Sequence, residues 1–432
     1  MKKIIVAGAG HGGLAAAALL AAQGYDVTVL EAKKRAEMGH DWHDVMNRDT
    51  LETLLTDPPA EDPFIPHTNT GFVSPSKQTE LAEPYRRSET AGYIDRKVLL
   101  RLLIENAERA GAKLRFGVRA VSAACDCEKV TGVRVFERGR IREYAGDLVI
   151  DSAGIDSPVR RTLPGSFGVP NEIRPEETFY TWRGYFENPE NTLTEPAIRV
   201  FFYHNGRPGM DWVNTKEGYV DVLVGGFQPI DQSDVDRAVA DFRADYPFMG
   251  NRIRGGSFVK IPLRRTLPVI VANGYAAVGD CAAMTGPLSG SGIDLSMRAG
   301  RILADTVSAA GDAPLTAQVL WKYQYDYFKA CGNGQISYDI LKGVLNRLTA
   351  QEVNFLMESK ILTLKEISSA GIRKYNAREF AEKLNILKKP RIVPGLARAL
   401  RHLSQIDAVC AKLPETYDKK KIAAWAKTYE AL

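Results

Sequence analysis

The first 31 residues constrain the fold of this chain more than any other stretch. A short apolar run (Lys2–Ala7) leads into the glycine-rich sequence GAGHGG, and an Ala- and Leu-rich run of helical length follows. Gly24 ends that predicted helix, and YDVTVLE (Tyr25–Glu31) has the composition of a second buried strand. The order strand, glycine loop, helix and strand, closed by an acidic residue, predicts a dinucleotide-binding unit.

Each residue of this motif has a physical role. Gly8 allows the tight turn, Gly10 lets the backbone approach a pyrophosphate, and Gly13 lets helix and strand pack closely. Glu31 is expected to accept hydrogen bonds from ribose hydroxyls. A signal peptide and a membrane span are weaker interpretations. Glycines interrupt the apolar run, and it is shorter than the roughly 20 residues that a span needs.

Composition narrows the class of protein. A chain of 432 residues can form two or three domains, and a net charge of +5 does not by itself predict nucleic-acid binding. The number of cysteines is odd, and their spacing matches neither a redox pair nor a zinc site, so we expect reduced thiols in a cytoplasmic protein and no metal. The cysteines are Cys125, Cys127, Cys281, Cys331 and Cys410.

A second glycine-rich block follows a later apolar strand. Tyr275–Val278 has strand composition and ends in Gly279-Asp280, and GPLSGSGI then leads into a predicted helix. The Asp280 carboxylate can accept hydrogen bonds from ribose or ribityl hydroxyls, and the glycines let the backbone contact a ring system. The candidate cofactor contacts of this block are Gly279, Asp280, Gly290, Gly292 and Ile293.

The regions on either side of this block differ in predicted secondary structure. From about residue 177 to 261, β-rich segments separated by Asn, Gly and Pro predict an antiparallel sheet. The chain beyond about residue 315 is predicted to be helical and ends in a basic segment. Within it, KKPRIVPGLARALRHL (Lys388–Leu403) could lie on an anionic membrane surface, or it could be a solvated helix face.

Four blocks together resemble FAD-dependent oxidoreductases of the p-hydroxybenzoate hydroxylase class. They are the Gly8–Glu31 unit, Arg96, the sequence SAGIDSPVR and the Gly279–Ala304 block. Within that class the sequence is most similar to the geranylgeranyl reductase family. The Gly279–Ala304 block and PGMDWVNTKEGYVDVLVGG (Pro208–Gly226) carry this likeness, which covers roughly residues 1–310.

The resemblance implies an α/β fold with FAD as the cofactor. A three-layer, Rossmann-like FAD-binding domain would comprise residues 1–165 and 265–312. Residues 166–264 would form an antiparallel β-sheet substrate domain, and 313–432 a helical C-terminal region. Arg96 would neutralise FAD phosphates, although it could instead form a surface pair with Asp95. NAD(P)H or ferredoxin would donate the electrons.

The substrate motif of the family is only partly kept. Trp212 stands at the motif's Trp, whereas Met210 replaces its Tyr, Asn214 its Phe and Thr215 its Pro. The expected substrate contacts are Tyr180, Met210, Trp212 and Asn214. Because the replacements make one end of the pocket more polar, we expect a substrate that carries a polar group.

The function that this resemblance implies is FAD-dependent reduction of a carbon–carbon double bond in a largely apolar substrate such as an isoprenoid. Two alternatives stay open from the sequence: an FAD-dependent monooxygenase, and an FAD protein that only passes electrons to a partner. No nucleic-acid partner is expected, and the protein would be cytoplasmic or associated with a membrane.

His40 and His43 are the candidate catalytic residues. They stand where some family members place a cysteine near the flavin, and Asp41 and Asp44 flank them. A nearby carboxylate would raise the pKa of an imidazole and keep a proton available near neutral pH. The alternative is a polar loop whose histidines only complete local hydrogen bonds.

Overall fold

The apolar N-terminal run forms the centre of a six-stranded sheet in the computed structural model, which describes residues 1–66, 68–82, 90–364, 367 and 383–432. Neighbouring strands run parallel except at the β18–β19 edge. In spatial order the strands are β18 (Val271–Ala272), β19 (Tyr275–Ala277), β12 (Leu148–Asp151), β1 (Lys3–Ala7), β2 (Asp26–Glu31) and β8 (Lys113–Phe116).

Two further layers enclose this sheet, as the three-layer prediction requires. One contains α1 (His11–Ala22), α3 (Arg96–Arg109) and α6 (Ile293–Ala309), and the other is an antiparallel sheet of β9 (Arg119–Cys125), β10 (Val130–Glu137) and β11 (Arg140–Ala145). Helices α1 and α6 cross closely: a Cβ atom on Gly300 would lie 2.3 Å from the Gly12 carbonyl oxygen. The predicted α/β fold is confirmed.

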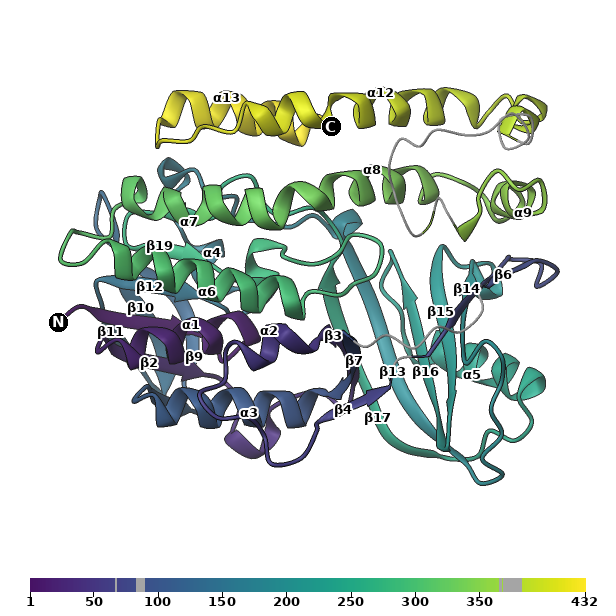
Figure 1. The fold of residues 1–432 in the computed structure, drawn as a ribbon, viewed down its shortest axis with the longest axis horizontal. Helices are drawn as coiled ribbons and strands as arrows, with labels where there is room; N and C mark the ends of the chain where they lie inside the picture. Colours follow the sequence, from purple (N-terminus) through teal and green to yellow (C-terminus); the bar gives the residue numbers. More distant parts are fainter. Residues whose placement is uncertain (67, 83–89, 365–366, 368–382) are drawn as a thin grey trace.

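A seven-stranded sheet forms the second large body of the fold (Figure 1). Its pairs are antiparallel except β14–β5. One face packs on α5 (Gln232–Asp245). The strands in order are β17 (Arg252–Pro262), β13 (Thr178–Asn188), β16 (Gly218–Gly226), β15 (Gly209–Lys216), β14 (Ile198–Phe202), β5 (Thr70–Val73) and β6 (Glu80–Ala82).

Strands β5 and β6 come from a segment that the sequence assigned to the first domain. They are too short for their apolar alternation to be read, and β5 pairs in parallel with β14, more than a hundred residues later. The same part of the chain also contributes α2 (Arg48–Glu52) and a small sheet of three strands, in the order β3 (His43–Asn47), β7 (Ala91–Asp95) and β4 (Phe64–Pro66). That small sheet brings His43 to the large sheet, where the Tyr185 hydroxyl accepts a hydrogen bond from the His43 backbone nitrogen at 2.9 Å.

The C-terminal region is helical, as predicted, throughout its described part. In Figure 1, α12 and α13 form an outer row beyond α7, α8 and α9. Aromatic packing holds this row in place, with the Phe328 and Trp425 rings 5.3 Å apart. No helix within the described ranges is long and apolar enough to cross a membrane. The helices are α7 (Ala317–Ala330), α8 (Gln335–Leu345), α9 (Ala350–Glu358), α12 (Val393–Ala411) and α13 (Lys419–Glu430).

Candidate active site

The first glycine loop packs directly on Ser152, which follows β12. Gly8 has a φ of +89°. A Cβ atom on Gly8 or on Gly10 would lie 2.5 Å from a Ser152 oxygen, and one on Gly13 would lie 2.6 Å from the Ser152 side chain. The Gly13 nitrogen also donates a hydrogen bond to Ser152 Oγ at 3.2 Å. A side chain at position 10 would therefore collide with Ser152 even without a bound phosphate, so packing alone favours glycine there. Sequence reasoning missed Ser152 as the residue that imposes this constraint.

The Glu31 carboxylate closes this loop at the end of β2. It accepts hydrogen bonds from the backbone nitrogens of Ala9 and Lys33, both at 2.8 Å. Each carboxylate oxygen can accept more than one hydrogen bond, so Glu31 keeps capacity for the ribose hydroxyls that the sequence assigned to it.

Arg96 lies at the start of α3 beside the glycine loop. Its Nε donates a hydrogen bond to Asp44 Oδ2 at 2.6 Å, and its guanidinium carbon lies 4.7 Å from the centre of the Trp42 ring. Burial by itself would raise the pKa of Asp44, but the charge of Arg96 and its hydrogen bond hold that pKa below its usual range. Burial, helped by Arg96, lowers the pKa of His11 to about 4. Arg96 thus pairs with Asp44 rather than with its neighbour Asp95, and sequence reasoning missed both Asp44 and His11.

Asp280 and the second glycine-rich loop form the other side of the cradle. Asp280 lies in a 3-10 turn, η5 (Gly279–Ala282), directly after β19. Burial raises the pKa of Asp280, and the nearby charge of Arg96 opposes that rise. Gly290 has a φ of +69°, and Gly292 caps the start of α6, which begins at Ile293. All five predicted residues of this block lie together, and all except Gly279 line one cavity.

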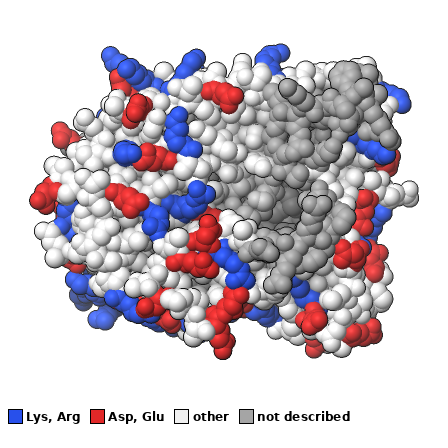
Figure 2. Space-filling model, viewed as in Figure 1, with Lys and Arg blue, Asp and Glu red and all other residues white. Residues whose placement is uncertain are grey.

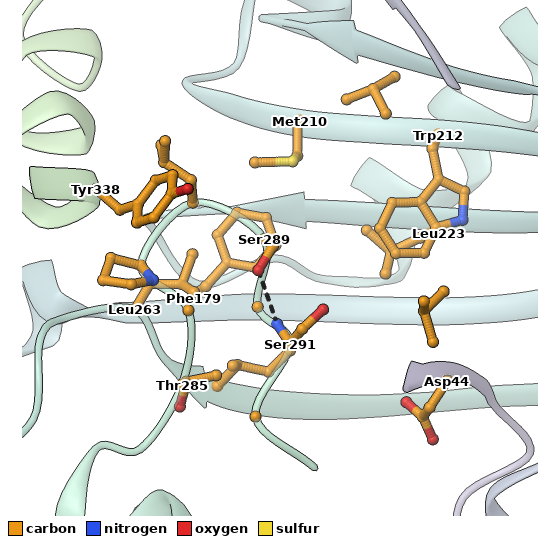
Figure 3. A pocket seen from close by; sticks show the side chains of 18 of the residues that line it. Asp44, Phe179, Met210, Trp212, Leu223, Leu263, Thr285, Ser289, Ser291 and Tyr338 are labelled. Carbon is orange, nitrogen blue, oxygen red and sulfur yellow. Dashed lines mark hydrogen bonds between the residues drawn. The ribbon is translucent and has the colours of Figure 1, made fainter. Parts of the chain in front are cut away.

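This cavity, about 1030 Å³ in volume, lies between the second glycine-rich loop and the seven-stranded sheet. Met210, Trp212 and Asn214 alternate along β15 and all line it, as the sequence predicts. Figure 3 shows Met210, Trp212 and Leu223 on the sheet across from the Ser289–Ser291 turn, with Tyr338 on one side and Asp44 on the other. The same cavity extends to His11 and Arg96, so the phosphate end and the sheet end are continuous.

Tyr180, a predicted substrate contact, does not line the cavity. On β13 the cavity is lined by Phe179 and Arg183. Tyr180 lies on the opposite face of the strand, the same face as Trp182, which packs in the core beneath α5. Side chains alternate between the two faces of a strand, so choosing the wrong one of two adjacent aromatic residues moves the contact to the opposite face.

The predicted rise in the histidine pKa values is also wrong. Burial, with Lys33 and Arg96 nearby, lowers the pKa of His40 to about 4, and burial with Arg254 lowers that of His43. The flanking carboxylates are taken by other cations. Asp44 binds Arg96, and the Asp41 carboxylate accepts a hydrogen bond from Lys97 Nζ at 2.6 Å. His43 lines the cavity, whereas His40 does not.

The C-terminal helices complete an apolar wall that sequence reasoning missed. On α8, Tyr338, Leu341 and Leu345 face the cavity, while Ile336 and Ile340 pack in the main core. Residues from α9 and the segment that follows it extend the wall: Val353, Leu362, Leu364 and Ile367. The sequence does contain a signal for this wall, because α8 is apolar on two sides. A helix needs only one apolar side to pack on the core, so the second side indicates another contact.

The described part of the chain contains no group of three or more His, Cys, Asp or Glu side chains that could hold a metal ion. All five cysteines are free thiols. Cys281 is buried in the core, and burial raises the pKa of its thiol well above the usual value.

Comparisons with known proteins agree with this geometry. The profile of the FAD binding domain family matches residues 1–247. Digeranylgeranylglycerophospholipid reductase of Methanothrix thermoacetophila is 25% identical over 412 residues, covering 93% of this chain and 98% of the relative. A geranylgeranyl bacteriochlorophyll reductase-like protein (Ta0516) from Thermoplasma acidophilum shares the fold with a TM-score of 0.72 at 18% identity, covering 92% of this chain and 99% of that one. The myxobacterial halogenase CndH also shares it, with a TM-score of 0.59 at 16% identity, covering 89% and 96%.

The chain belongs to the FAD binding domain family, and its resemblance to the geranylgeranyl reductases is confirmed. It is an FAD-dependent oxidoreductase. The site fits this cofactor. His11 Nε2 and Thr285 Oγ1 are buried polar atoms that line the cavity and have no hydrogen-bond partner within the described structure, so a bound group can pair with them. The glycine loop, Glu31, Arg96 and Asp280 would hold FAD.

Arg96 provides a direct test of this assignment. In Arg96→Met the phosphates would lose a guanidinium and face the unpaired Asp44 carboxylate, so we expect FAD to bind at least about tenfold more weakly. Arg96→Lys should fall between the two because it keeps the charge but loses the planar fork. The measurement is the flavin retained per protein after desalting, followed by titration with FAD.

Arg134→Met is the matched control, because Arg134 is exposed and, among the residues that the structure describes, forms its ion pair with Glu143 on a surface hairpin. It should retain FAD as the parent does. Full FAD occupancy in Arg96→Met, with an unchanged melting temperature, would contradict the assignment.

Proposed function

We propose that the chain reduces a carbon–carbon double bond in a largely apolar isoprenoid substrate. The observation that carries this proposal is one continuous cavity, which runs from His11, Arg96 and the second glycine-rich loop to the apolar wall of the C-terminal helices. Such a cavity suits a long apolar chain whose reacting carbons must lie against a flavin. The name of the Methanothrix relative, a reductase of a geranylgeranyl lipid, supports the same substrate class.

Reducing a double bond adds a hydride to one carbon and a proton to the other. FAD, once reduced, supplies the hydride. The chain itself orients the substrate and keeps water away. Phe179, Leu223 and Leu263 form an apolar cluster on the sheet that Met210 and Trp212 extend. NAD(P)H or ferredoxin would supply the electrons, and anaerobic loss of the oxidised flavin absorbance with each donor decides between them.

Substrate length tests this use of the cavity. Leu341→Trp adds volume to the apolar wall and should shorten the space available to the chain. We expect kcat/KM for geranylgeraniol to fall at least about tenfold, while that for the shorter geraniol changes little, because overpacking a fitted cavity is unfavourable.

The matched control for this prediction is Leu193→Trp, at an exposed position in the loop between β13 and β14. It should leave both substrates unaffected. Equal effects of Leu341→Trp on the two alcohols would show that the wall does not hold the chain.

The histidine pKa values also lead to a prediction. Because burial lowers the pKa of His43, its imidazole is neutral at pH 7 and is a poor proton donor. His43→Gln should therefore reduce the rate of double-bond reduction less than tenfold, and the pH profile above about pH 7 should keep its shape. A loss of about 10²–10⁴-fold, the usual contribution of a general acid, would restore the catalytic role. His40→Gln, outside the cavity, is the control.

We further propose that the C-terminal helices lie on an anionic membrane, from which an apolar substrate can enter. From Lys388 onward the chain has ten Lys or Arg and four Asp or Glu, a surplus of six, whereas the whole chain has a net charge of +5. Leu400 on α12 is 58% exposed, and Leu387, in the short 3-10 turn before α12, is 65% exposed. Figure 2 shows Lys and Arg side chains along the upper edge, where α12 and α13 lie. Exposed apolar groups among basic ones are typical of a helix at a membrane surface.

Charge reversal tests this contact. Lys388→Glu, Arg398→Glu and Arg401→Glu combined should lower binding to phosphatidylglycerol vesicles at least about tenfold, since each basic residue near an anionic surface contributes about 1 kcal/mol. The matched control reverses three exposed charges elsewhere: Arg119, Lys129 and Arg140. Co-sedimentation measures both, and equal binding by the two triple variants would contradict the proposal.

A further inference from the structure

Asn214 places an unpartnered amide in the sheet wall of the cavity. On β15 it lies between Ile198 of β14 and Asp221 of β16. Its side chain is 4% exposed and lines the cavity, and its Oδ1 has no hydrogen-bond partner within the described ranges. Buried polar atoms in folded proteins are nearly always hydrogen-bonded, so this acceptor indicates a place for a ligand group.

The neighbouring ion pair does not satisfy this amide. Arg183 Nε donates a hydrogen bond to Asp221 Oδ1 at 2.8 Å, and Nη2 donates to Oδ2 of the same carboxylate. The two side chains are only 5% and 2% exposed. The Trp212 and Trp42 rings lie 5.3 and 5.7 Å from the guanidinium carbon. The pair is therefore internally neutralised and enclosed, and it leaves the Asn214 amide for a ligand.

A second unpartnered polar atom belongs to the same end of the cavity. Trp42, whose ring lies beside Arg183, is 4% exposed, and no described residue accepts from its Nε1. Asn214 Oδ1 needs a donor and Trp42 Nε1 needs an acceptor, and a hydroxyl group can meet either need. A carboxylate or a fully ionised phosphate has no proton to donate to Asn214 Oδ1. The site therefore suits a neutral hydroxyl.

This polar end lies far from the apolar wall. Phe202 pairs with Met210 and packs against the C-terminal cluster that contains Leu348. Asn214 is four residues further along β15, which is about 13 Å for an extended strand. A substrate bound along the sheet can therefore place a polar end at Asn214 and an apolar chain under the C-terminal helices.

We infer that Asn214 forms a subsite for a hydroxyl group of the substrate, so that the preferred substrates are isoprenoid alcohols. This inference rests on the proposed function. It identifies the residue that selects the substrate by its polar group, at a position where the geranylgeranyl reductase motif has an apolar Phe.

The test compares geranylgeraniol with the hydrocarbon of the same chain that lacks the hydroxyl. Equilibrium dialysis against the FAD-loaded protein, at fixed detergent, gives the two dissociation constants. We expect the parent protein to bind the alcohol at least about tenfold more tightly, because a site built to bond a hydroxyl rejects an analogue that lacks it. Asn214→Leu should bring the two constants within about twofold, mainly by weakening the alcohol.

Two further variants make the result decisive. Met210→Leu, on the same strand and face, should keep the parental preference. Asn214→Thr has a smaller side chain that still carries a hydroxyl, so it should keep part of the preference for the alcohol. It provides the test if Asn214→Leu does not fold. A parental preference in Asn214→Leu or its absence in the parent would overturn the subsite. If both compounds are reduced without preference, only the subsite fails, whereas reduction of neither contradicts the proposed function.

Discussion

The contact between the first glycine loop and Ser152 is the constraint on which the site depends. Strands β1, β12 and β19 are parallel neighbours, so their carboxyl ends meet at one edge of the sheet. Ligands of open α/β sheets bind at this edge. Here the Gly8–Gly13 loop can approach only because its glycines leave room for Ser152. That approach brings Arg96 and Asp280 to the same cavity from opposite parts of the chain.

The second determinant is the change in polarity along the cavity. The glycine-rich loop after Asp280 faces a sheet whose inner surface is apolar around Leu223 and ionic at Arg183–Asp221. Although burial opposes it, Asp221 raises the pKa of Arg183 above its usual range, so the guanidinium stays charged within the apolar wall. Under the proposed function, a cavity with one apolar end and one polar end would orient an amphipathic chain and so fix which carbons lie against the cofactor.

Local patterns of the sequence predicted the parts of the site that a single segment builds. The Gly8–Glu31 unit and the Gly279–Ile293 block are contiguous, and their spacing alone indicates the turns they form. The likeness of Pro208–Gly226 to the family's substrate motif likewise pointed to Met210, Trp212 and Asn214, which share one face of β15 and line the cavity. Tyr180 was placed on the wrong face of β13, because the face that each residue of a strand presents to the cavity is set by partners that lie far away in the sequence.

The remaining differences have the same cause. The His40 and His43 pKa values follow from burial and from cations of other segments, which also occupy the carboxylates expected to help them. The apolar wall of α8 depends on how a C-terminal helix docks beside the sheet. Neither the burial of the histidines nor the docking of α8 can be predicted from the residues of the segments that carry the histidines or the motifs. Pairings across the chain, rather than local propensity, decided these parts of the site.

Under the proposed function, electrons held by the cofactor pass to a substrate double bond in this cavity. It is tested most directly by mixing the photoreduced protein with geranylgeraniol without oxygen and determining the product by mass spectrometry. The account predicts a product heavier by two hydrogens, formed in an amount equal to the reduced FAD. A product that contains an added oxygen atom and forms only in air, or reduced protein that leaves the alcohol unchanged, would contradict it.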